Sequence, residues 1–246
     1  MKRSRPIDTT ISDYAAVVGI DSVQGVPVIV GGQAANAWAL FYFSRIGKQL
    51  ARLRPFTSKD LDLAGDRCLL ERIHHVTGGD IFYSGPRTPV IGYVETLIRD
   101  VPRKIEVLRD VNGLSRPELA DAVDLIVDGL RVRVLAPVKV LKAKICNAVT
   151  LDQADRNDVN HLLIMIECVR EFIRDILVEI IEGRATQRDA VNLLEELREI
   201  VSSPTAAKAA RMWGLDFSSV WPLHDMSQCG MQKILRFVEF RLSPPA

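Results

Sequence analysis

The first third of the chain alternates between short apolar runs and polar turns. A short helix and turn are predicted over residues 1–25. Residues 26–30 (VPVIV) are apolar, largely β-branched and followed by two glycines, which is typical of a buried strand. Helical spacing extends over residues 33–53, and residues 59–64 then alternate between polar and apolar side chains, as in a strand with one buried face. The pattern predicts a strand, a long helix and a second strand.

Further strand patterns follow before residue 136. A short helix over residues 69–76, closed by two glycines, precedes them. Asp128 and Gly129 form a strong signal for a tight hairpin turn between the last two strands. The four strand patterns cover residues 89–98, 104–108, 122–127 and 130–135. Many strands with few helices indicate an α+β or α/β protein, and we predict an α+β fold: a mixed sheet flanked by helices.

From Pro137 onwards the hydrophobic spacing becomes helical. Proline is favoured at the first position of a helix, and apolar residues then recur at intervals of three and four. The predicted helices cover residues 138–149, 159–180, 186–201 and 228–242. We therefore divide the chain into a sheet-containing head, residues 1–136, and a helical C-terminal region, residues 137–246.

Composition bears on the size of the core, on binding partners and on cellular location. A chain of 246 residues with 48% apolar side chains can bury a substantial core. Its net charge of +1 does not favour a protein that binds polyanions over its whole surface. The four cysteines are scattered, which indicates neither a zinc knuckle nor a disulfide framework and favours a reduced, cytoplasmic location. No apolar core of a signal peptide follows the basic N-terminus, and no membrane segment is predicted.

Two aspartates in residues 58–63 (SKDLDL) are the first candidates for chemistry. A strand with this spacing directs Asp60 and Asp62 to one face, where the two carboxylates repel each other unless a cation lies between them. Mg²⁺ prefers such oxygen ligands. Glu106, flanked by apolar residues in a predicted strand, is the best third carboxylate, and Glu95 is its competitor. The alternative for each is a solvated position on a strand.

Gly31 and Gly32 are candidates for phosphate binding. They end a strand and begin a helix, where the backbone can approach a ligand closely and the free N–H groups favour anions. A tight turn or close packing is the alternative reading of the two glycines. Lys59 and Lys144 are further candidates for contact with phosphate, and for each the alternative is a solvated side chain that balances charge.

The order of these features resembles the DNA polymerase β-like nucleotidyltransferase superfamily. The resemblance is closest to small bacterial members of the abortive-infection, or type IV toxin–antitoxin, type. It is carried by residues 31–34 (GGQA) and 57–63 (TSKDLDL), and by a proline-started helix with a lysine, followed by a basic–acidic segment. The last two elements correspond here to residues 137–144 and 156–158. The match extends over about residues 26–166.

This resemblance implies an enzyme that moves a nucleoside monophosphate from an NTP, such as ATP, to an acceptor hydroxyl. It implies Mg²⁺ or Mn²⁺ held by Asp60, Asp62 and Glu106, which are also the catalytic residues. The NTP would be bound near Gly31 and Gly32, with Lys59 and Lys144 as further contacts. The acceptor would be tRNA, a protein or a small molecule, and a cognate antitoxin-like partner would bind the protein. The helical C-terminal region would bind the acceptor or this partner.

Several positions depart from the superfamily pattern. Gly32 replaces a common serine, and Asn157 and His161 stand where lysine and aspartate are common. The interval from Gly32 to Asp60 is also longer than in the most compact members. These departures motivate a second hypothesis, an interaction protein with the same fold and a weak or inactive site. A sugar-nucleotide glycosyltransferase also uses Asp-x-Asp, but that fold places the motif later in the chain.

Overall fold

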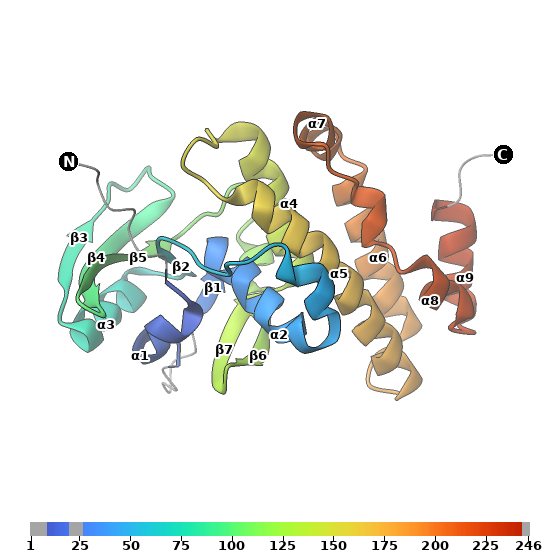
Figure 1. Cartoon of the computed structure of the whole chain (residues 1–246), viewed down its shortest axis with the longest axis horizontal. Coiled ribbons are helices and arrows are strands. Elements are labelled where there is room, and N and C mark those ends of the chain that lie inside the picture. The colour runs from blue at the N-terminus through green and yellow to red at the C-terminus, as the bar shows by residue number, and fades with distance from the viewer. Residues whose placement is uncertain (1–8, 20–26, 243–246) are drawn as a thin grey trace. The chain divides into compact units, whose positions relative to one another are not determined.

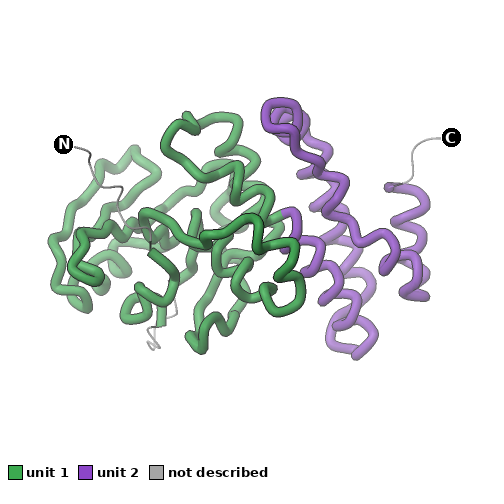
Figure 2. Tube along the Cα trace, viewed as in Figure 1, with its two compact units in different colours: residues 1–165 green, residues 166–246 purple. Residues whose placement is uncertain are grey.

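The computed structural model describes residues 9–19 and 27–242. The chain forms two compact units, residues 1–165 and residues 166–246 (Figure 2). Of the helix and turn predicted over residues 1–25, the described part contains a short 3₁₀ turn, η1 (Ile11–Tyr14), and one helical turn, α1 (Ala15–Val18). The rest of that prediction, and the first residue of the strand predicted over 26–30, lie outside the described residues.

The first unit is built on a mixed sheet, which has seven strands within the described residues (Figure 1). The strands are β1 (Val28–Val30), β2 (Leu61–Ala64), β3 (Asp80–Tyr83), β4 (Val90–Ile98), β5 (Val101–Leu108), β6 (Ala122–Val127) and β7 (Leu130–Leu135). Their order is β3-β4-β5-β2-β1-β7-β6. β1 is parallel to β7 and β2 is parallel to β5, whereas the other neighbours are antiparallel. The predicted mixed sheet and α+β class are confirmed.

Three helices of the first unit matter for the site: two pack on the sheet, and the third packs on the first of them. They are α2 (Gly31–Ala51), α3 (Arg67–Thr77) and α4 (Pro137–Thr150). α2 contacts β1, β2, β6 and β7, and α3 contacts β3, β4 and β5. The buried Trp38 anchors α2, because its indole N–H donates to the carbonyl of Leu135 at 3.0 Å. The position of α2 matters because its first turn follows directly from β1.

The change of hydrophobic period at Pro137 coincides with the start of α4. The division near residue 136 was placed at this change, whereas the compact unit continues to residue 165. The reason is that α4 packs against α2 and buries Val138, Leu141 and Ile145. The first unit therefore contains helical elements downstream of the sheet as well as the sheet itself.

The second unit is helical within the described residues. Its elements are the C-terminal part of α5 (Asp158–Ile181), α6 (Gln187–Val201), α7 (Pro204–Trp213), η3 (Phe217–Val220), α8 (Leu223–Gln228), α9 (Gln232–Phe237) and a π-helical turn, η4 (Val238–Leu242). α6 packs against α9, and Leu197 and Ile234 are fully buried. Arg174 of α5 donates to the Asp225 carboxylate of α8 at 2.7 Å.

Several elements differ from their prediction. β3 is an edge strand in which three of four residues are exposed, so it lacks a buried alternating pattern. β5 begins at Val101 because its first residues form a hairpin with the end of β4. The helix predicted over residues 228–242 is interrupted at Gly230, whose φ of +69° is left-handed. α7 was not predicted, although Ser203 and Pro204 form a typical helix start.

All four cysteines are free. Among the helices of the described ranges, none combines the length and the apolar character that crossing a membrane requires.

Candidate functional site

The parallel pairing of β2 with β5 brings Asp62 and Glu106 together. These two residues are direct register partners in the sheet. Leu61 and Leu63 flank Asp62 and are fully buried, so the alternation of the strand turns the aspartate to the opposite face. Ile105 and Val107 fix the direction of Glu106 in the same way. Two carboxylates from strands more than forty residues apart therefore lie side by side.

Asp60 joins this pair from a bend rather than from a strand. The second strand was predicted to begin at Lys59, but β2 begins at Leu61. Ser58 pairs with Thr9 in an isolated β-bridge, which holds the chain immediately before the bend. Asp60 is half-buried there, next to the first residue of β2. We name Asp60, Asp62 and Glu106 the acidic cluster.

The pKa values of both aspartates in the acidic cluster are raised. Burial, followed by the charges of Glu106 and Asp60, raises the pKa of Asp62 to about 7, against the opposing effect of Lys144 and Arg156. Burial and then Glu106 also raise the pKa of Asp60, while nearby cations lower it. Each ionised carboxylate is destabilised by burial and by its neighbours. A bound cation would relieve both effects.

Glu106 is directed toward a cation of the protein. Its Oε1 atom lies 2.5 Å from Nζ of Lys104, which also covers the ring of Tyr93 at 4.1 Å. Among the described residues, no group of three acidic, histidine or cysteine side chains is arranged to hold a metal ion. The competitor Glu95 is exposed and pairs across the sheet with Lys104, not with Asp62. Of the two candidates, Glu106 is therefore the one beside Asp62.

Gly31 gives Asp62 the space that it occupies. Its φ is +64°, a left-handed conformation that favours glycine. A Cβ atom on Gly31 would lie only 1.9 Å from Oδ2 of Asp62. The first glycine of the pair therefore lets the carboxylate approach the start of α2. This is a structural reason for glycine at position 31, in addition to the predicted contact with phosphate.

The first turn of α2 has free backbone donors. Its N-cap is Val30, which makes no side-chain capping hydrogen bond, and the turn contains no acidic residue. The first N–H groups of a helix have no partner within the helix and carry a partial positive charge. Gly32 is closely surrounded, because a Cβ atom there would lie 2.7 Å from Oγ of Ser58 and 3.0 Å from Cε1 of His161.

Lys144 belongs to a cluster of paired charges beside the acidic cluster. Its Nζ atom donates to Oδ1 of Asp158 at 2.7 Å, and Nε of Arg156 donates to Oδ2 of the same carboxylate at 2.6 Å. Lys144 and Asp158 are both almost fully buried. Lys144 is thus neither solvated nor directed at a free site, although its charge lowers the pKa of Asp62. We name Lys144, Arg156 and Asp158 the ion-paired cluster.

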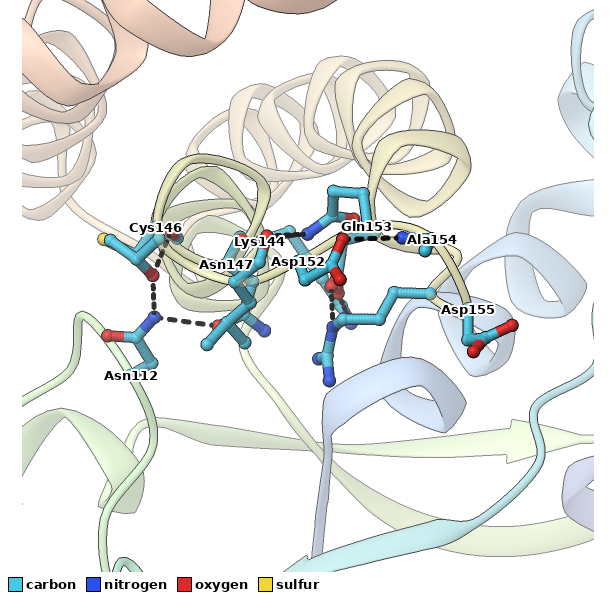
Figure 3. Close-up of polar contacts among 12 residues, drawn as sticks. Asn112, Lys144, Cys146, Asn147, Asp152, Gln153, Ala154 and Asp155 are labelled. Atoms are coloured by element: carbon cyan, nitrogen blue, oxygen red, sulfur yellow. Dashed lines mark hydrogen bonds and ion pairs between the residues drawn. The ribbon is translucent and has the colours of Figure 1, made fainter.

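The turn between α4 and α5 accepts a hydrogen bond from Lys59 and is itself tied to α4. Lys59 is exposed, and its Nζ atom donates to the carbonyl of Asp155 at 3.0 Å. Gln153 donates to the carbonyl of Asn147, and Asn112 donates to the side chain of Asn147, each at 3.0 Å (Figure 3). The bond from Gln153 ties the turn to the end of α4, and the bond from Asn112 ties the loop that follows β5 to the same end of α4.

Three residues near these clusters were missed by reasoning from the sequence. Lys104 was seen only as part of a strand, although it is two residues from Glu106 and thus on the same face. Arg156 was noted only as part of a motif, and His161 was noted only as a departure from the superfamily pattern. The signal that was available for His161 is its spacing, three residues after Asp158 and four before the buried Met165, on one helix face.

A surface pocket of about 930 Å³ lies at the other ends of the same strands. It is lined by Val28 and Ala64, at the far ends of β1 and β2, and by Arg67, Arg109 and Arg116 among others. None of the three residues of the acidic cluster lines it. We place the candidate site at the acidic cluster, because the perturbed carboxylates and the open helix start meet there and not at the pocket.

The architecture is that of an α+β protein with a mixed sheet flanked by helices. No protein-family model matches the chain, and no curated protein matches it. Among solved structures, it is similar to the crystal structure of an antigenic nucleotidyltransferase-like protein from Paracoccidioides brasiliensis. The two share 15% identity and a TM-score of 0.39 over 66% of this chain and 78% of that one. This likeness is too distant to carry an argument, so the function is argued from the site.

Proposed function

We propose that the protein is a nucleotidyltransferase of the DNA polymerase β-like type, which transfers a nucleoside monophosphate from an NTP to an acceptor hydroxyl. One observation carries the proposal: the Asp62 carboxylate lies at the turn that opens α2, in the space left by Gly31. Perturbed acids and a helix start with free donors therefore occupy the same place. This juxtaposition suits a ligand that carries both phosphate and a divalent cation.

The phosphates are assigned to the first turn of α2. The turn has a glycine pair, no capping side chain and no acidic residue, so its N–H groups are available to anionic oxygens. Lys59 is exposed beside Asp60, and its flexible side chain can turn from the Asp155 carbonyl to a phosphate. Lys144 acts differently from what the sequence suggested: in this proposal its charge stabilises the ionised form of Asp62.

The acidic cluster has the donor chemistry for a divalent cation, although its three side chains are not arranged around one in this structure. Three carboxylates are the hard oxygen ligands that Mg²⁺ or Mn²⁺ prefers. Burial and crowding raise the pKa values of Asp60 and Asp62 despite the nearby cations, and a bound divalent cation would offset both effects. Bound there, the cation would neutralise phosphate oxygens and orient the reacting groups. Glu106 would have to leave Lys104 to complete this set of ligands.

The residues of the chain then have defined tasks in the transfer. The acceptor oxygen forms a bond to the α-phosphorus of the NTP, and the bond from that phosphorus to the bridging oxygen of the leaving pyrophosphate breaks. The proton of the acceptor hydroxyl passes to a carboxylate, and Glu106 is the candidate that we propose. The first turn of α2 holds the departing phosphates in line. The acceptor is tRNA, a protein or a small molecule, and a toxin role with an antitoxin-like partner is part of the same proposal.

A transfer assay tests this function. The protein is incubated with each α-phosphate-labelled NTP, Mg²⁺ or Mn²⁺, and bulk tRNA or cell extract, and labelled products are separated by size. We expect label on an acceptor, and Asp62→Asn should reduce it at least about a hundredfold, since the charge stabilisation of the transition state is lost. The matched control is Asp66→Asn, which lies beyond the other end of β2 and retains a good N-cap for α3. Absence of transfer with every NTP contradicts the proposal.

A second candidate function follows from the contact between Glu106 and Lys104. In a weak or inactive site, this ion pair would be permanent and the protein would act by binding a partner. The geometry of Glu106 favours this candidate, and the unpaired charges of Asp60 and Asp62 speak against it. The assay separates the two, because only the enzyme transfers label.

A further inference from the structure

His161 is a buried polar side chain without a hydrogen-bond partner. It lies in the first turn of α5 and is 4% exposed. Neither Nδ1 nor Nε2 has a partner among the described residues. Buried polar atoms are nearly always hydrogen-bonded, and leaving one unpaired costs free energy. An imidazole with two such atoms therefore requires an explanation.

The ring of His161 faces the start of α2. The position of a Cβ atom on Gly32 lies 3.0 Å from Cε1 of this ring. Cε1 is the carbon between the two nitrogens, so the polar edge of the imidazole is turned toward the first turn of α2. That helix has 21 residues and no side-chain cap at its N-terminus. The backbone N–H groups of the first turn of α2 and the unpaired imidazole of His161 thus lie next to each other.

The charges around His161 favour an anion. Burial, followed by Lys144 and Arg156, holds the pKa of His161 well below its usual value, while Asp158 opposes them. The ring is therefore neutral and has one N–H donor and one acceptor nitrogen. Of the three charges that act on His161, two are cations and one is a carboxylate. The start of α2 adds a partial positive charge. An anionic oxygen is therefore a suitable acceptor for the ring N–H of His161.

We propose that His161 is a nucleotide-binding residue whose ring N–H donates to a phosphate oxygen held at Gly31 and Gly32. The inference rests on the proposed function and adds a specific contact to it. The competing occupant is a water molecule that satisfies the same ring atoms. The two make opposite predictions, because loss of a water contact changes stability alone, whereas loss of a phosphate contact changes affinity.

The test is calorimetric titration of the full chain with ATP and with sodium tripolyphosphate, each in the presence of Mg²⁺. His161→Phe retains a ring of similar size without polar atoms. We expect it to weaken binding of both ligands about tenfold, the effect of losing one hydrogen bond to a charged group. Thermal unfolding should show no loss of stability, since an unpaired buried polar group is removed. The matched control is His75→Phe on α3, at an exposed histidine, which should bind as the wild type does.

Two further variants identify the donor. The amide nitrogen of asparagine replaces Nδ1 and that of glutamine replaces Nε2, so one of His161→Asn and His161→Gln should retain affinity within about threefold of the wild type. Unchanged affinity in His161→Phe overturns the inference and leaves the proposed function intact. So does a loss that affects ATP but spares tripolyphosphate, because the contact would then not be to phosphate. A wild type that binds neither ligand contradicts both, whereas binding without any transfer of label contradicts the proposed enzyme alone.

Discussion

The acidic cluster and the ion-paired cluster lie beside each other in the first unit, and their buried aspartates have pKa values shifted in opposite directions. In the ion-paired cluster, burial alone would raise the pKa of Asp158, but Lys144 and Arg156 outweigh it and lower that pKa to about 2. In the acidic cluster, burial and the neighbouring carboxylates raise the pKa of Asp62 to about 7. The two aspartates thus differ because Asp158 has two cations at hydrogen-bond distance, whereas Asp62 is crowded by other carboxylates.

This difference separates a structural charge from one that awaits a ligand. A buried carboxylate with two cations at hydrogen-bond distance is already stabilised and has no need of a further partner. A carboxylate crowded by other carboxylates gains from any cation that arrives. Perturbed acids of the second kind concentrate at functional sites. The contrast therefore supports the assignment of binding chemistry to Asp60 and Asp62 and of positioning to Asp158.

The two clusters should also affect stability in opposite pH ranges. Asp158 has a lowered pKa in the folded state, so its contribution is present above its unfolded value near pH 4 and is lost as pH falls toward 2. Asp62 has a raised pKa, so its favourable contribution is present below about pH 4 and is lost as pH rises through about 7. Substitutions at the two positions can test the comparison directly.

Removing the counterion of Lys144 should have the largest effect on stability. Asp158→Asn leaves the buried Lys144 ammonium without its carboxylate, which we expect to lower the free energy of unfolding by about 3–5 kcal/mol at neutral pH. Urea unfolding measures this change. The double variant Lys144→Met, Asp158→Leu should recover most of the loss, because a buried ion pair replaced by apolar residues is often neutral. A single variant as stable as the wild type would refute the structural role of this cluster.

Neutralising Asp62 should have a smaller effect of the opposite sign. A pKa raised from 3.8 to about 7 corresponds to about 4 kcal/mol, of which we expect about half because solvent reaches part of the carboxylate. Asp62→Asn should therefore be more stable than the wild type by about 2 kcal/mol near pH 8 and equal to it near pH 4. Chemical unfolding at both pH values measures the difference. A stability difference that does not change with pH would show that Asp62 is not perturbed by its neighbours.

Much of the sheet followed from hydrophobic alternation. β6, β7 and their Asp128–Gly129 turn were predicted with their observed bounds, because both strands alternate and the turn residues adopt left-handed conformations. Edge and short elements such as β3 and α8 were not predicted, because few of their residues are buried and the pattern is weak. The helical pattern was read from residue 33, two residues after α2 begins, because its two leading glycines are poor helix formers.

The three acids were singled out from the sequence, and the structure places Asp62 beside Glu106, but the residues around them were not predicted. Alternation in β5 indicated that Glu106 points away from the core, but its place beside Asp62 depends on a parallel pairing across more than forty residues, which no local pattern specifies. The burial of Lys144 and His161 also depends on tertiary packing, because the sequence does not show which neighbouring elements cover the polar positions of their helices. The roles of these residues in metal and nucleotide binding remain predictions.

Releasing Glu106 from Lys104 should have the smallest effect and sharpens the comparison most. The ion pair is partly exposed, and such pairs are weak, so a bound cation can compete with it. Lys104→Met removes both the competing ammonium and a positive charge near the acidic cluster. We expect Mn²⁺ affinity, measured by calorimetric titration, to rise about threefold.

The matched control for this substitution is Lys142→Met, which breaks a similar ion pair with Glu118 away from the acidic cluster. It should leave Mn²⁺ affinity unchanged. If Lys104→Met also leaves the affinity unchanged, or lowers it, Glu106 is not a ligand of the cation. The acidic cluster then reduces to Asp60 and Asp62, and Glu106 belongs with the paired, structural charges of the first unit.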